Sequence, residues 1–429
     1  MTVVLPVIGL LVLILIGIPI GFSLLIAGGL GLFLNSGMEA MNGILQTTPH
    51  ASAASFVLTT IPMFILLAEF TTSSGITTKA FKACHRWVGH LPGGLAIATV
   101  LASAGLAAIS GSSTASAATM AKTAVPEMRK YKYKDSFSVG IVSVAGTLAI
   151  MIPPSIILII YGILTEVPIA PLLIAGIVPG VLTALGFILS IYITAKRQPE
   201  MAPKAEPFPI KEKVQSLKGI WPMMILIFLI VVAIYTGAVT PTEAGAVGAF
   251  FSFLIAVFLF STKFPQIKHA LNQTMKTTCM IFVIIIGAMV FGYFLTATQV
   301  TQQLISFVGE LPVHPYVIMG IIVLIYLLLG TFMDQLAILF LTIPLTFPIA
   351  QSLGFDPIWF GIIVTKTAEI GLITPPLGMN VYIASSAAKV PVTEAFKGVW
   401  KLLVVEFIIL ILLFFFPLLS TWLPSQMNM

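Results

Sequence analysis

The chain has 429 residues, of which 58% are hydrophobic and only 8% are charged, and its mean hydropathy is +1.09. Soluble globular proteins carry about 25% charged residues, so this composition excludes a water-soluble fold. The net charge of +6 would suggest nucleic acid as a partner in a soluble protein. In a membrane protein it indicates no such partner, and the positions of the charges along the chain indicate the topology instead.

Repeated apolar runs of about 20 residues predict an all-α polytopic membrane protein. They do not alternate polar and apolar residues, as the strands of a transmembrane β-barrel do. Ten runs are read as membrane spans, in chain order 3–17, 20–36, 52–73, 136–164, 170–195, 219–239, 243–261, 277–297, 358–387 and 400–422. The spans at 136–164 and 358–387 each contain a proline pair and are predicted to be broken helices.

Two further apolar stretches, 92–125 and 312–350, are predicted to be re-entrant hairpins. Each is interrupted by a polar or glycine-rich sequence, at 110–114 and at 330–334. The second arm of the first stretch, 115–125, is too short to cross a hydrocarbon core of about 30 Å. Basic residues flank the first hairpin on both sides, and the flanks of the second carry none. We therefore expect the two hairpins to enter from opposite sides of the membrane.

Twenty of the 21 Lys and Arg residues fall in five blocks, at 79–86, 122–134, 196–218, 263–276 and 389–401. Lys and Arg mark cytoplasmic loops, so we place all five blocks inside the cell. An external N-terminus, ten crossings and two hairpins satisfy this placement and leave the C-terminus outside as well. The first 78 residues contain no Lys or Arg, whereas a signal peptide has a positive n-region, so none is expected.

The two halves of the chain repeat each other at a distance of about 220 residues. Four proline motifs recur in the same order: Pro19 and Pro241, Pro92 and Pro312, Pro153-Pro154 and Pro375-Pro376, and Pro168 and Pro391. Five crossings in each half make the second copy inverted. We predict a first repeat at 1–195, a cytoplasmic linker at 196–218 and a second repeat at 219–429. Inverted repeats with interrupted helices are typical of secondary transporters.

The proline pairs predict backbone carbonyls without helical partners, because each proline removes an N–H and clashes with the preceding turn. In lipid such breaks persist only where protein, water or an ion meets them. We expect segment 146–154 to face the first hairpin tip and 367–379 to face the second. Freed carbonyls and Ser or Thr hydroxyls suit Na⁺, and the following helix N-termini suit a substrate carboxylate. The alternative is that the breaks are only kinks in closely packed helices.

Within these segments, Met151, Pro153, Asp334 and Thr374 are candidate Na⁺ ligands. The candidate substrate contacts are Ser112, Thr114, Pro154, Ser155, Lys366, Pro376 and Asn380. Lys366 lies deep in its span, where a charge is costly and indicates a function; it either meets an anionic substrate or pairs with Glu369 one turn along the helix. Asp334 either coordinates a cation or caps the helix that follows it.

Three motifs resemble the large membrane subunit of tripartite ATP-independent periplasmic (TRAP) transporters. They are Ser-Gly-Ser-Ser-Thr-Ala at 110–115, Gly-Thr-Leu-Ala-Ile-Met-Ile-Pro-Pro-Ser at 146–155, and Gly-Leu-Ile-Thr-Pro-Pro-Leu-Gly-Met-Asn-Val-Tyr at 371–382. The resemblance covers essentially the whole chain. It implies an elevator-type, Na⁺-coupled importer of an organic acid, such as sialic acid or a C4-dicarboxylate, in a bacterial inner membrane. The implied partners are a separate small four-helix membrane subunit and a periplasmic substrate-binding protein.

The same resemblance implies two Na⁺ sites built largely from backbone carbonyls. The family's ligands map onto Ser110, Ser113, Gly146 and Ala149 in the first site, and onto Gly330, Thr331, Thr367, Gly371 and Met379 in the second. The first break reads Gly-Thr-Leu-Ala where family members often have Gly-x-x-Gly, so this chain departs from the pattern at individual ligands.

Other functions remain open from the sequence. The main alternative is a related divalent-anion/Na⁺ symporter that works without a binding protein. A plain channel fits closed hairpins and cation-sized oxygen sites less well. An integral-membrane enzyme would need clustered acidic or His residues at one membrane face, which the sequence lacks, so no catalytic residue and no organic cofactor is predicted. No G-x-x-x-x-G-K-[ST] motif occurs, so an ion gradient is the expected energy source.

Overall fold

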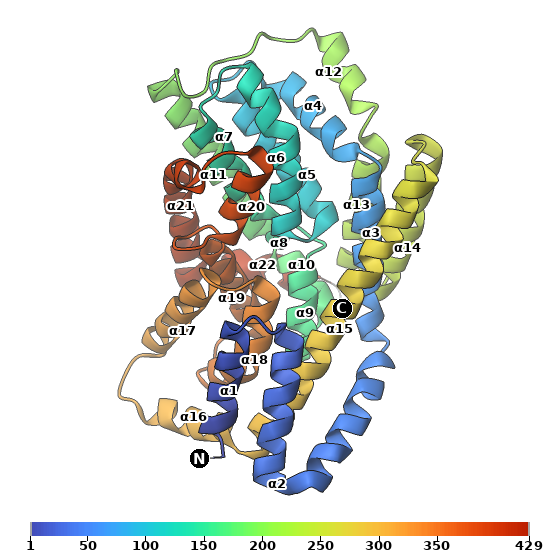
Figure 1. Cartoon of the computed structure of the whole chain (residues 1–429). Helices are drawn as coiled ribbons and strands as arrows, with labels where there is room; N and C mark the ends of the chain where they lie inside the picture. Colours follow the sequence, from blue (N-terminus) through green and yellow to red (C-terminus); the bar gives the residue numbers. More distant parts are fainter. Residues whose placement is uncertain (1, 428–429) are drawn as a thin grey trace.

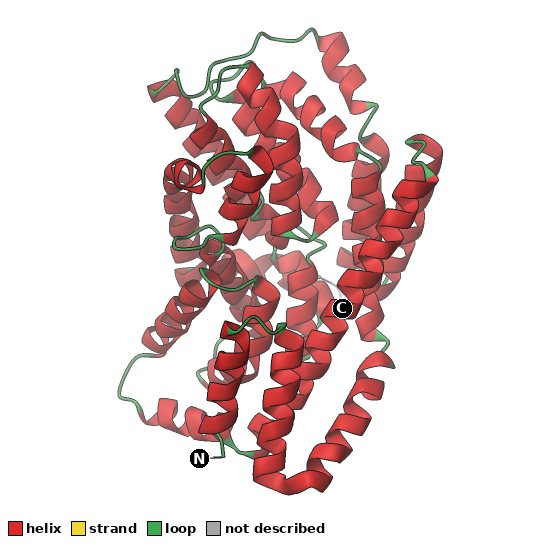
Figure 2. Ribbon diagram, in the orientation of Figure 1, coloured by secondary structure: helices red, strands yellow, loops and turns green. Residues whose placement is uncertain are grey.

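The computed structural model describes residues 2–427, and every regular element in that range is helical (Figure 1 and Figure 2). The all-α prediction is confirmed. The first half contains α1 (Val4–Leu15), α2 (Ile20–Ala53), η1 (Val57–Thr59), α3 (Thr60–Ser73), α4 (Ile76–Val88), α5 (Gly94–Ser110), α6 (Ser113–Lys130), α7 (Asp135–Ala145), α8 (Leu148–Met151), α9 (Ile156–Thr165), α10 (Ile169–Ala175) and α11 (Ile177–Arg197).

The second half contains α12 (Ile210–Leu217), α13 (Trp221–Tyr235), α14 (Pro241–Leu254), η2 (Ile255–Leu259), α15 (Phe264–Ala297), α16 (Val300–Glu310), α17 (Pro315–Gly330), α18 (Gln335–Ser352), α19 (Pro357–Gly371), α20 (Met379–Ala388), α21 (Val392–Phe415) and α22 (Leu418–Ser425). The segment predicted as a linker, 196–218, comprises the end of α11, an irregular stretch and α12. In Figure 1 that stretch runs over the top of the molecule.

The chain is a multi-pass membrane protein. In residues 2–427, six helices are long and apolar enough to cross a membrane, or up to nine if three strongly bent pairs each form one span. Our prediction of ten spans also counted α1, which has 12 residues. At about 1.5 Å per residue such a helix is shorter than a hydrocarbon core of about 30 Å. It further counted α19 and α20 as one broken span, and the structure does break this helix at the predicted proline pair.

The two longest helices, α2 and α15, have 34 residues each and pack against each other in the lower half of Figure 1. They pack backbone against backbone, because a Cβ at Gly28 would lie 2.7 Å from the backbone nitrogen of Phe291. Hydropathy predicted only their apolar parts, 20–36 and 277–297. The structure continues α2 beyond a bend at Gly37, where φ is +85°, and begins α15 at Phe264. We call α2 and α15 the central pair.

Two helical hairpins point toward each other from opposite ends of the molecule in Figure 1. The first, α5–α6, turns at Gly111, and the second, α17–α18, turns between Gly330 and Gln335. The opposed hairpins have the orientation that an inverted repeat requires. The second arm of the first hairpin was predicted from hydropathy to end at residue 125, but α6 has 18 residues and continues to Lys130. Its last turn is polar and basic, so hydropathy placed the end too early.

Each half also contains a helix that is broken at its proline pair. In the first half the break separates α7 and the short α8 from α9, and in the second half it separates α19 from α20. The Pro153-Pro154 and Pro375-Pro376 peptide bonds are both cis. Both breaks therefore lie at corresponding places, directly before a short helix that starts inside the molecule.

The end of the chain differs from the prediction of a span at 400–422. α21 begins at Val392 and ends at Phe415, where Pro417 follows and cannot continue the helix. α22 then turns back and packs against α10, α11 and α19. The last helix thus covers the broken-helix region instead of extending the final span.

Candidate transport site

The first hairpin tip is a tight turn between two helix ends. α5 ends at Ser110, Gly111 adopts a left-handed conformation with φ of +56°, and Ser112 begins the next turn. The Ser112 hydroxyl caps α6 by accepting a hydrogen bond from the Ala115 N–H at 3.4 Å. Ser110 and Ser116 join their hydroxyls at 2.7 Å, which ties the two arms together just behind the turn. The tip is thus held by its own side chains.

This tip lies directly against the first break. A Cβ on Gly146 would lie 2.9 Å from the Ser113 carbonyl oxygen, and one on Gly111 would lie 3.3 Å from the Pro154 carbonyl oxygen. Ser155 caps α9, since its hydroxyl accepts from the Leu158 N–H at 3.3 Å. Glycines at the contact therefore bring the backbone of the tip onto the backbone of the break, as the proline pattern predicted.

The second tip repeats this arrangement with different residues. A Cβ on Gly330 would lie 2.7 Å from the Ala368 carbonyl oxygen and 2.8 Å from Cα of Gly371, so the tip and α19 touch through their backbones. Asp334 caps α18 and accepts a hydrogen bond from the Ala337 N–H at 3.2 Å. The capping alternative for Asp334 is therefore realised, and a role in cation binding stays a hypothesis.

Asn380, in the first turn of α20, connects the second break to the first tip. Its side-chain N–H donates to Glu369 Oε1 at 3.2 Å, and its Oδ1 accepts from the Ser113 hydroxyl at 3.4 Å. Its backbone N–H donates to the Leu372 carbonyl oxygen at 3.0 Å. One fully buried amide thus spans the two halves of the chain.

Lys366 does not pair with Glu369, so the alternative of a pair within one helix face is wrong. Its amino group forms an ion pair with Glu406 of α21 and donates to the Thr183 hydroxyl at 3.1 Å. The second carboxylate oxygen of Glu406 accepts from the Thr147 hydroxyl at 2.8 Å. α19 is buried on all sides here, so the Lys366 amino group cannot reach water. Its charge is compensated by the Glu406 carboxylate on α21. Lys366 does not line the cavity between the tips.

A cavity of about 300 Å³ lies between the two hairpin tips. The first tip contributes 111–114, the second 334–336, and α15 supplies a wall between Thr277 and Ile284. Residues from the first turns of α6, α9, α18 and α20 all line it, and the polar lining residues include Ser112, Ser113, Thr114 and Thr277. Four helix N-termini thus direct partial positive charge into one small space. We call this space the central cavity.

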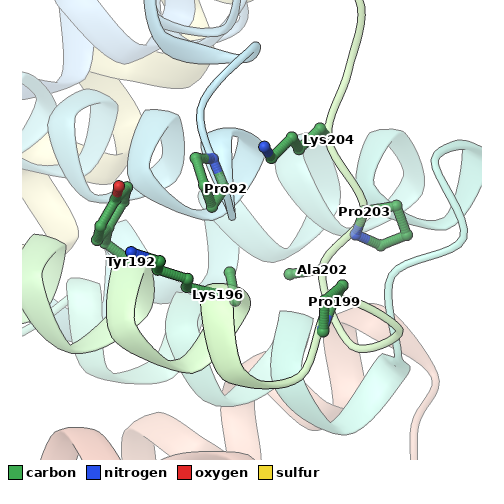
Figure 3. A pocket seen from close by; sticks show the side chains of 8 residues that line it. Pro92, Tyr192, Lys196, Pro199, Ala202, Pro203 and Lys204 are labelled. Carbon is green, nitrogen blue, oxygen red and sulfur yellow. The ribbon is translucent and has the colours of Figure 1, made fainter.

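Other cavities lie around this one. A space of about 650 Å³, lined by the turn between α1 and α2 together with Cys279, Met333 and Asp334, shares Met280 and Ile284 with the central cavity. A hollow of about 520 Å³ lies where the linker passes the base of the first hairpin; Figure 3 shows Pro92, Tyr192, Lys196 and Lys204 around it. None of its lining residues belongs to a hairpin tip, so this hollow is separate from the transport site.

The predicted site residues fall into three groups. Ser112, Ser113, Thr114, Asp334 and Met379 line the central cavity. The tips and breaks beside the cavity hold Ser110, Gly146, Ala149, Met151, Pro153, Pro154, Ser155, Gly330, Thr331, Thr367, Gly371, Thr374, Pro376 and Asn380. Lys366 alone turns away, toward α21. The hydroxyls of Thr331, Thr367 and Thr374 each donate to a carbonyl oxygen of their own helix, at 2.8, 2.8 and 2.7 Å.

Sequence reasoning missed three residues of this region. Gln335 lines the cavity and donates to the Thr365 carbonyl oxygen at 3.2 Å. Thr277 faces the cavity from α15, where nothing in the sequence distinguishes it. Glu406 was the detectable omission, because it is the one acidic residue within the long apolar run at 402–416. A lone carboxylate in such a run marks a partner for the lone Lys366.

Comparisons with known proteins agree with this geometry. The family described as "Tripartite ATP-independent periplasmic transporter, DctM component" matches residues 7–419. The chain belongs to this family. One DctM relative is the C4-dicarboxylate TRAP transporter large permease protein of Pseudomonas aeruginosa, which is 37% identical over 90% of this chain and 89% of its own length.

Another DctM relative is the sialic acid TRAP transporter large permease protein SiaM of Vibrio cholerae, 32% identical over 97% of both chains. Among solved structures, the chain is similar to the YdaH transporter of Alcanivorax borkumensis, with a TM-score of 0.64 over 91% of this chain and 90% of that one. At 14% identity this last likeness shows the fold alone. The DctM chain is therefore a TRAP-type large permease, and its relatives are permeases for different organic acids.

Proposed function

We propose that this DctM chain imports an organic acid together with Na⁺, and that the acid occupies the central cavity. The observation that carries the proposal is the convergence of both hairpin tips and both breaks on this one space. In secondary transporters with inverted repeats, substrate and ion sites lie where interrupted helices meet. The C4-dicarboxylate and sialic acid permeases among the relatives support an acid of one of these two kinds.

The lining of the central cavity supports an acidic cargo without any basic side chain. Its described lining residues include no Lys, Arg or His. The N-terminal turns of four helices line the cavity instead, although Ser112, Ser155 and Asp334 each cap one N–H group of their helix. The hydroxyls of Ser112, Thr114 and Thr277 could add donors. Helix N-termini bind carboxylates by these N–H groups and by the helix dipole. Asp334 would repel a carboxylate at its side of the cavity, so we expect the acid group to bind nearer the first tip.

The surroundings of the breaks fit Na⁺ as the coupling ion. Na⁺ is a hard cation that oxygen ligands hold, and Ser110, Ser113 and the carbonyls near Gly146 supply them at the first tip. Gly330, Thr331 and Gly371 supply them at the second. One buried oxygen of Glu369 also has no hydrogen-bond partner, so the region holds an uncompensated acceptor. We assign one ion to each tip, with the ligand sets predicted from the sequence.

For the transport movement we propose an elevator. The hairpins, the broken helices and the cargo would move as one body against the central pair. Each net positive charge that moves inward gains about 2.3 kcal/mol per 100 mV of membrane potential. A Na⁺ gradient and the membrane potential would together supply the energy.

We further propose that the chain works in a bacterial inner membrane with both termini outside. Its partners would be a small four-helix membrane subunit and a periplasmic binding protein that delivers the acid. Membership of the TRAP large permeases supports these partners. Lipid would cover the exposed apolar faces of the outer helices.

The test is uptake into proteoliposomes that contain the purified chain and its small subunit, with the binding protein outside. We expect uptake of labelled sialic acid or succinate that requires both an inward Na⁺ gradient and the binding protein. Uptake that ignores Na⁺ contradicts the coupling proposal. Uptake that proceeds without the binding protein supports the alternative of a symporter that works alone.

A further inference from the structure

Three charged side chains within residues 2–427 are at most 1% exposed: Lys366, Glu369 and Glu406. Lys366 forms its ion pair with Glu406. Glu369 makes no ion pair in the described part of the chain. Asn380 donates a hydrogen bond to Oε1 of Glu369, and the Oε2 atom has no hydrogen-bond partner in the described residues. These three buried side chains are therefore two acids and one base, which leaves one carboxylate without a cation.

Glu369 is placed between the two hairpin tips. Its carboxylate reaches the first tip through Asn380, whose Oδ1 accepts from the Ser113 hydroxyl. Its neighbour Ala368 and the glycine two residues on, Gly371, form the backbone contact with Gly330 of the second tip. Glu369 is thus joined to the first tip through Asn380 and flanked by the residues that touch the second tip, on a helix that is buried on every side.

The helices around Glu369 offer no further positive charge. α19 packs against α8, α9, α10, α17, α18, α21 and α22. Their titratable residues are Tyr161, Tyr316, Tyr326, Glu394, Lys397, Lys401 and Glu406, with Asp334 capping α18 and Tyr382 on the neighbouring α20. Lys397 pairs with Glu394 at the surface, and Lys401 donates to Gln198 at the surface. Tyr161 and Tyr326 use their hydroxyls on Pro357 and Thr346.

We propose that Glu369 is the fixed negative charge that offsets the cations bound at both hairpin tips. An isolated buried carboxylate is costly unless a positive charge compensates it. A Na⁺ ion at either tip supplies that charge, and the carboxylate in turn strengthens the binding of the ion. The inference deepens the proposed function and rests on its Na⁺ sites. It assigns to Glu369 an electrostatic role that the carbonyl ligands cannot perform.

The expected size follows from Coulomb's law. With an effective dielectric constant of about 20, removal of a carboxylate charge close to a bound ion weakens the affinity for that ion by about tenfold or more. The same effect is expected at both proposed sites, because Asn380 links Glu369 to the first tip and its neighbours Ala368 and Gly371 touch the second. A change in Na⁺ affinity of at least about tenfold is therefore expected for E369Q.

The experiment is a Na⁺ titration of thermal unfolding, measured on the purified full chain in detergent with its small subunit if the two co-purify. K⁺ replaces Na⁺ at constant ionic strength, and the Na⁺ concentration at half of the stabilisation gives the apparent affinity. E369Q is compared with E394Q, which removes the same charge from the exposed end of α21. We expect a loss of affinity in E369Q and an unchanged affinity in E394Q.

The outcomes separate the two proposals. If the wild-type protein and E369Q reach half of their stabilisation at the same Na⁺ concentration, the charge of Glu369 does not contribute to Na⁺ binding. Only this inference is then overturned. If Na⁺ stabilises the wild-type protein no better than K⁺ does, the proposed Na⁺ coupling fails and this inference fails with it. Should E369Q not purify in folded form, E369D and E369N replace it. Tighter Na⁺ binding by E369D than by E369N supports the inference, and equal binding overturns it.

Discussion

Lys366 of α19 and Glu406 of α21 form an ion pair that neither water nor lipid reaches. Thr183 of α11 accepts from the lysine, and Thr147, in the first break, donates to the glutamate. Two short polar side chains thus complete a link between helices from both halves of the chain. The lysine that stood out in the sequence takes part in the packing of α19, α21 and α11, and it does not line the central cavity.

Replacement of Lys366 alone is expected to be far more damaging than replacement of both partners. K366M leaves the Glu406 carboxylate buried without its cation, which costs about 3–5 kcal/mol for a broken buried pair. K366M/E406M removes both charges and keeps most of the side-chain volume, so we expect it to recover most of that loss. The measurement is the unfolding temperature of the purified variants in detergent. Equal instability of the single and double variants would show that the charges themselves are not what stabilises this contact.

A side chain at Gly330 is expected to separate the second tip from α19. In G330A the new Cβ would lie 2.7 Å from a backbone oxygen, which the two backbones cannot relieve without moving apart. Overpacking of this kind costs about 1–3 kcal/mol, and we expect uptake in proteoliposomes to be lost. The matched control is G320A in the same helix, where nothing lies within 4 Å. G320A should keep wild-type uptake, and loss of uptake in both variants would mean that α17 tolerates no change at all.

Asp334 allows the cap to be tested separately from the charge. Asn caps helices as well as Asp does, so D334N should keep the bond to the Ala337 N–H and the unfolding temperature of the wild type. D334A removes the cap and should cost about 1 kcal/mol. If D334N also keeps the Na⁺ response, the residue is only a cap. A weaker Na⁺ response with an unchanged unfolding temperature would instead support the cation role considered from the sequence.

Arg129 joins the first hairpin to two other helices at the basic end of the molecule. Its guanidinium binds both oxygens of Asp135 at 2.7 and 3.1 Å and also donates to the Ala388 carbonyl oxygen at 3.0 Å. Lys has no planar fork, so R129K should keep one of these contacts at most. We expect R129K to lower stability by no more than about 1 kcal/mol, because the side chains are partly exposed. The difference in stability between R129K and the wild type should shrink at high salt. The control K130Q, which removes only the surface pair of Lys130 with Glu127, should show no loss of stability.

Much of this architecture was predictable because the lipid restricts the sequence so strongly. Charges had to gather on one side, and prolines inside apolar runs had to mark breaks that protein or ions satisfy. The tips at Ser110–Thr114 and Gly330–Asp334 and their pairing with the two breaks followed from these constraints. Hydropathy failed wherever a helix continues through polar residues, as at the end of α6 and the start of α15.

Residue-level contacts were less predictable, because they depend on side-chain direction across distant segments. The i+3 spacing of Lys366 and Glu369 indicated a pair, but the fold offered Lys366 a carboxylate on another helix. Asn380 and Ser113 lie far apart in the sequence, and no local sequence pattern predicts the hydrogen bond between them. The sequence shows that the chain is rich in glycine, but only the structure shows that Gly146 and Gly330 allow close backbone contacts.

The wall that α15 contributes to the central cavity has a consequence for the proposed release of the acid. The other walls come from the two hairpins and the broken helices, whereas α15 is packed tightly onto α2. In the proposed elevator movement, sliding of the hairpins along α15 would remove one side of the enclosure, so movement and release would coincide. Cys279 lies on α15 next to this boundary and is an exposed free thiol. Because Cys279 is already accessible in this conformation, a change in its rate of reaction with a maleimide during transport would report movement of the hairpins along α15.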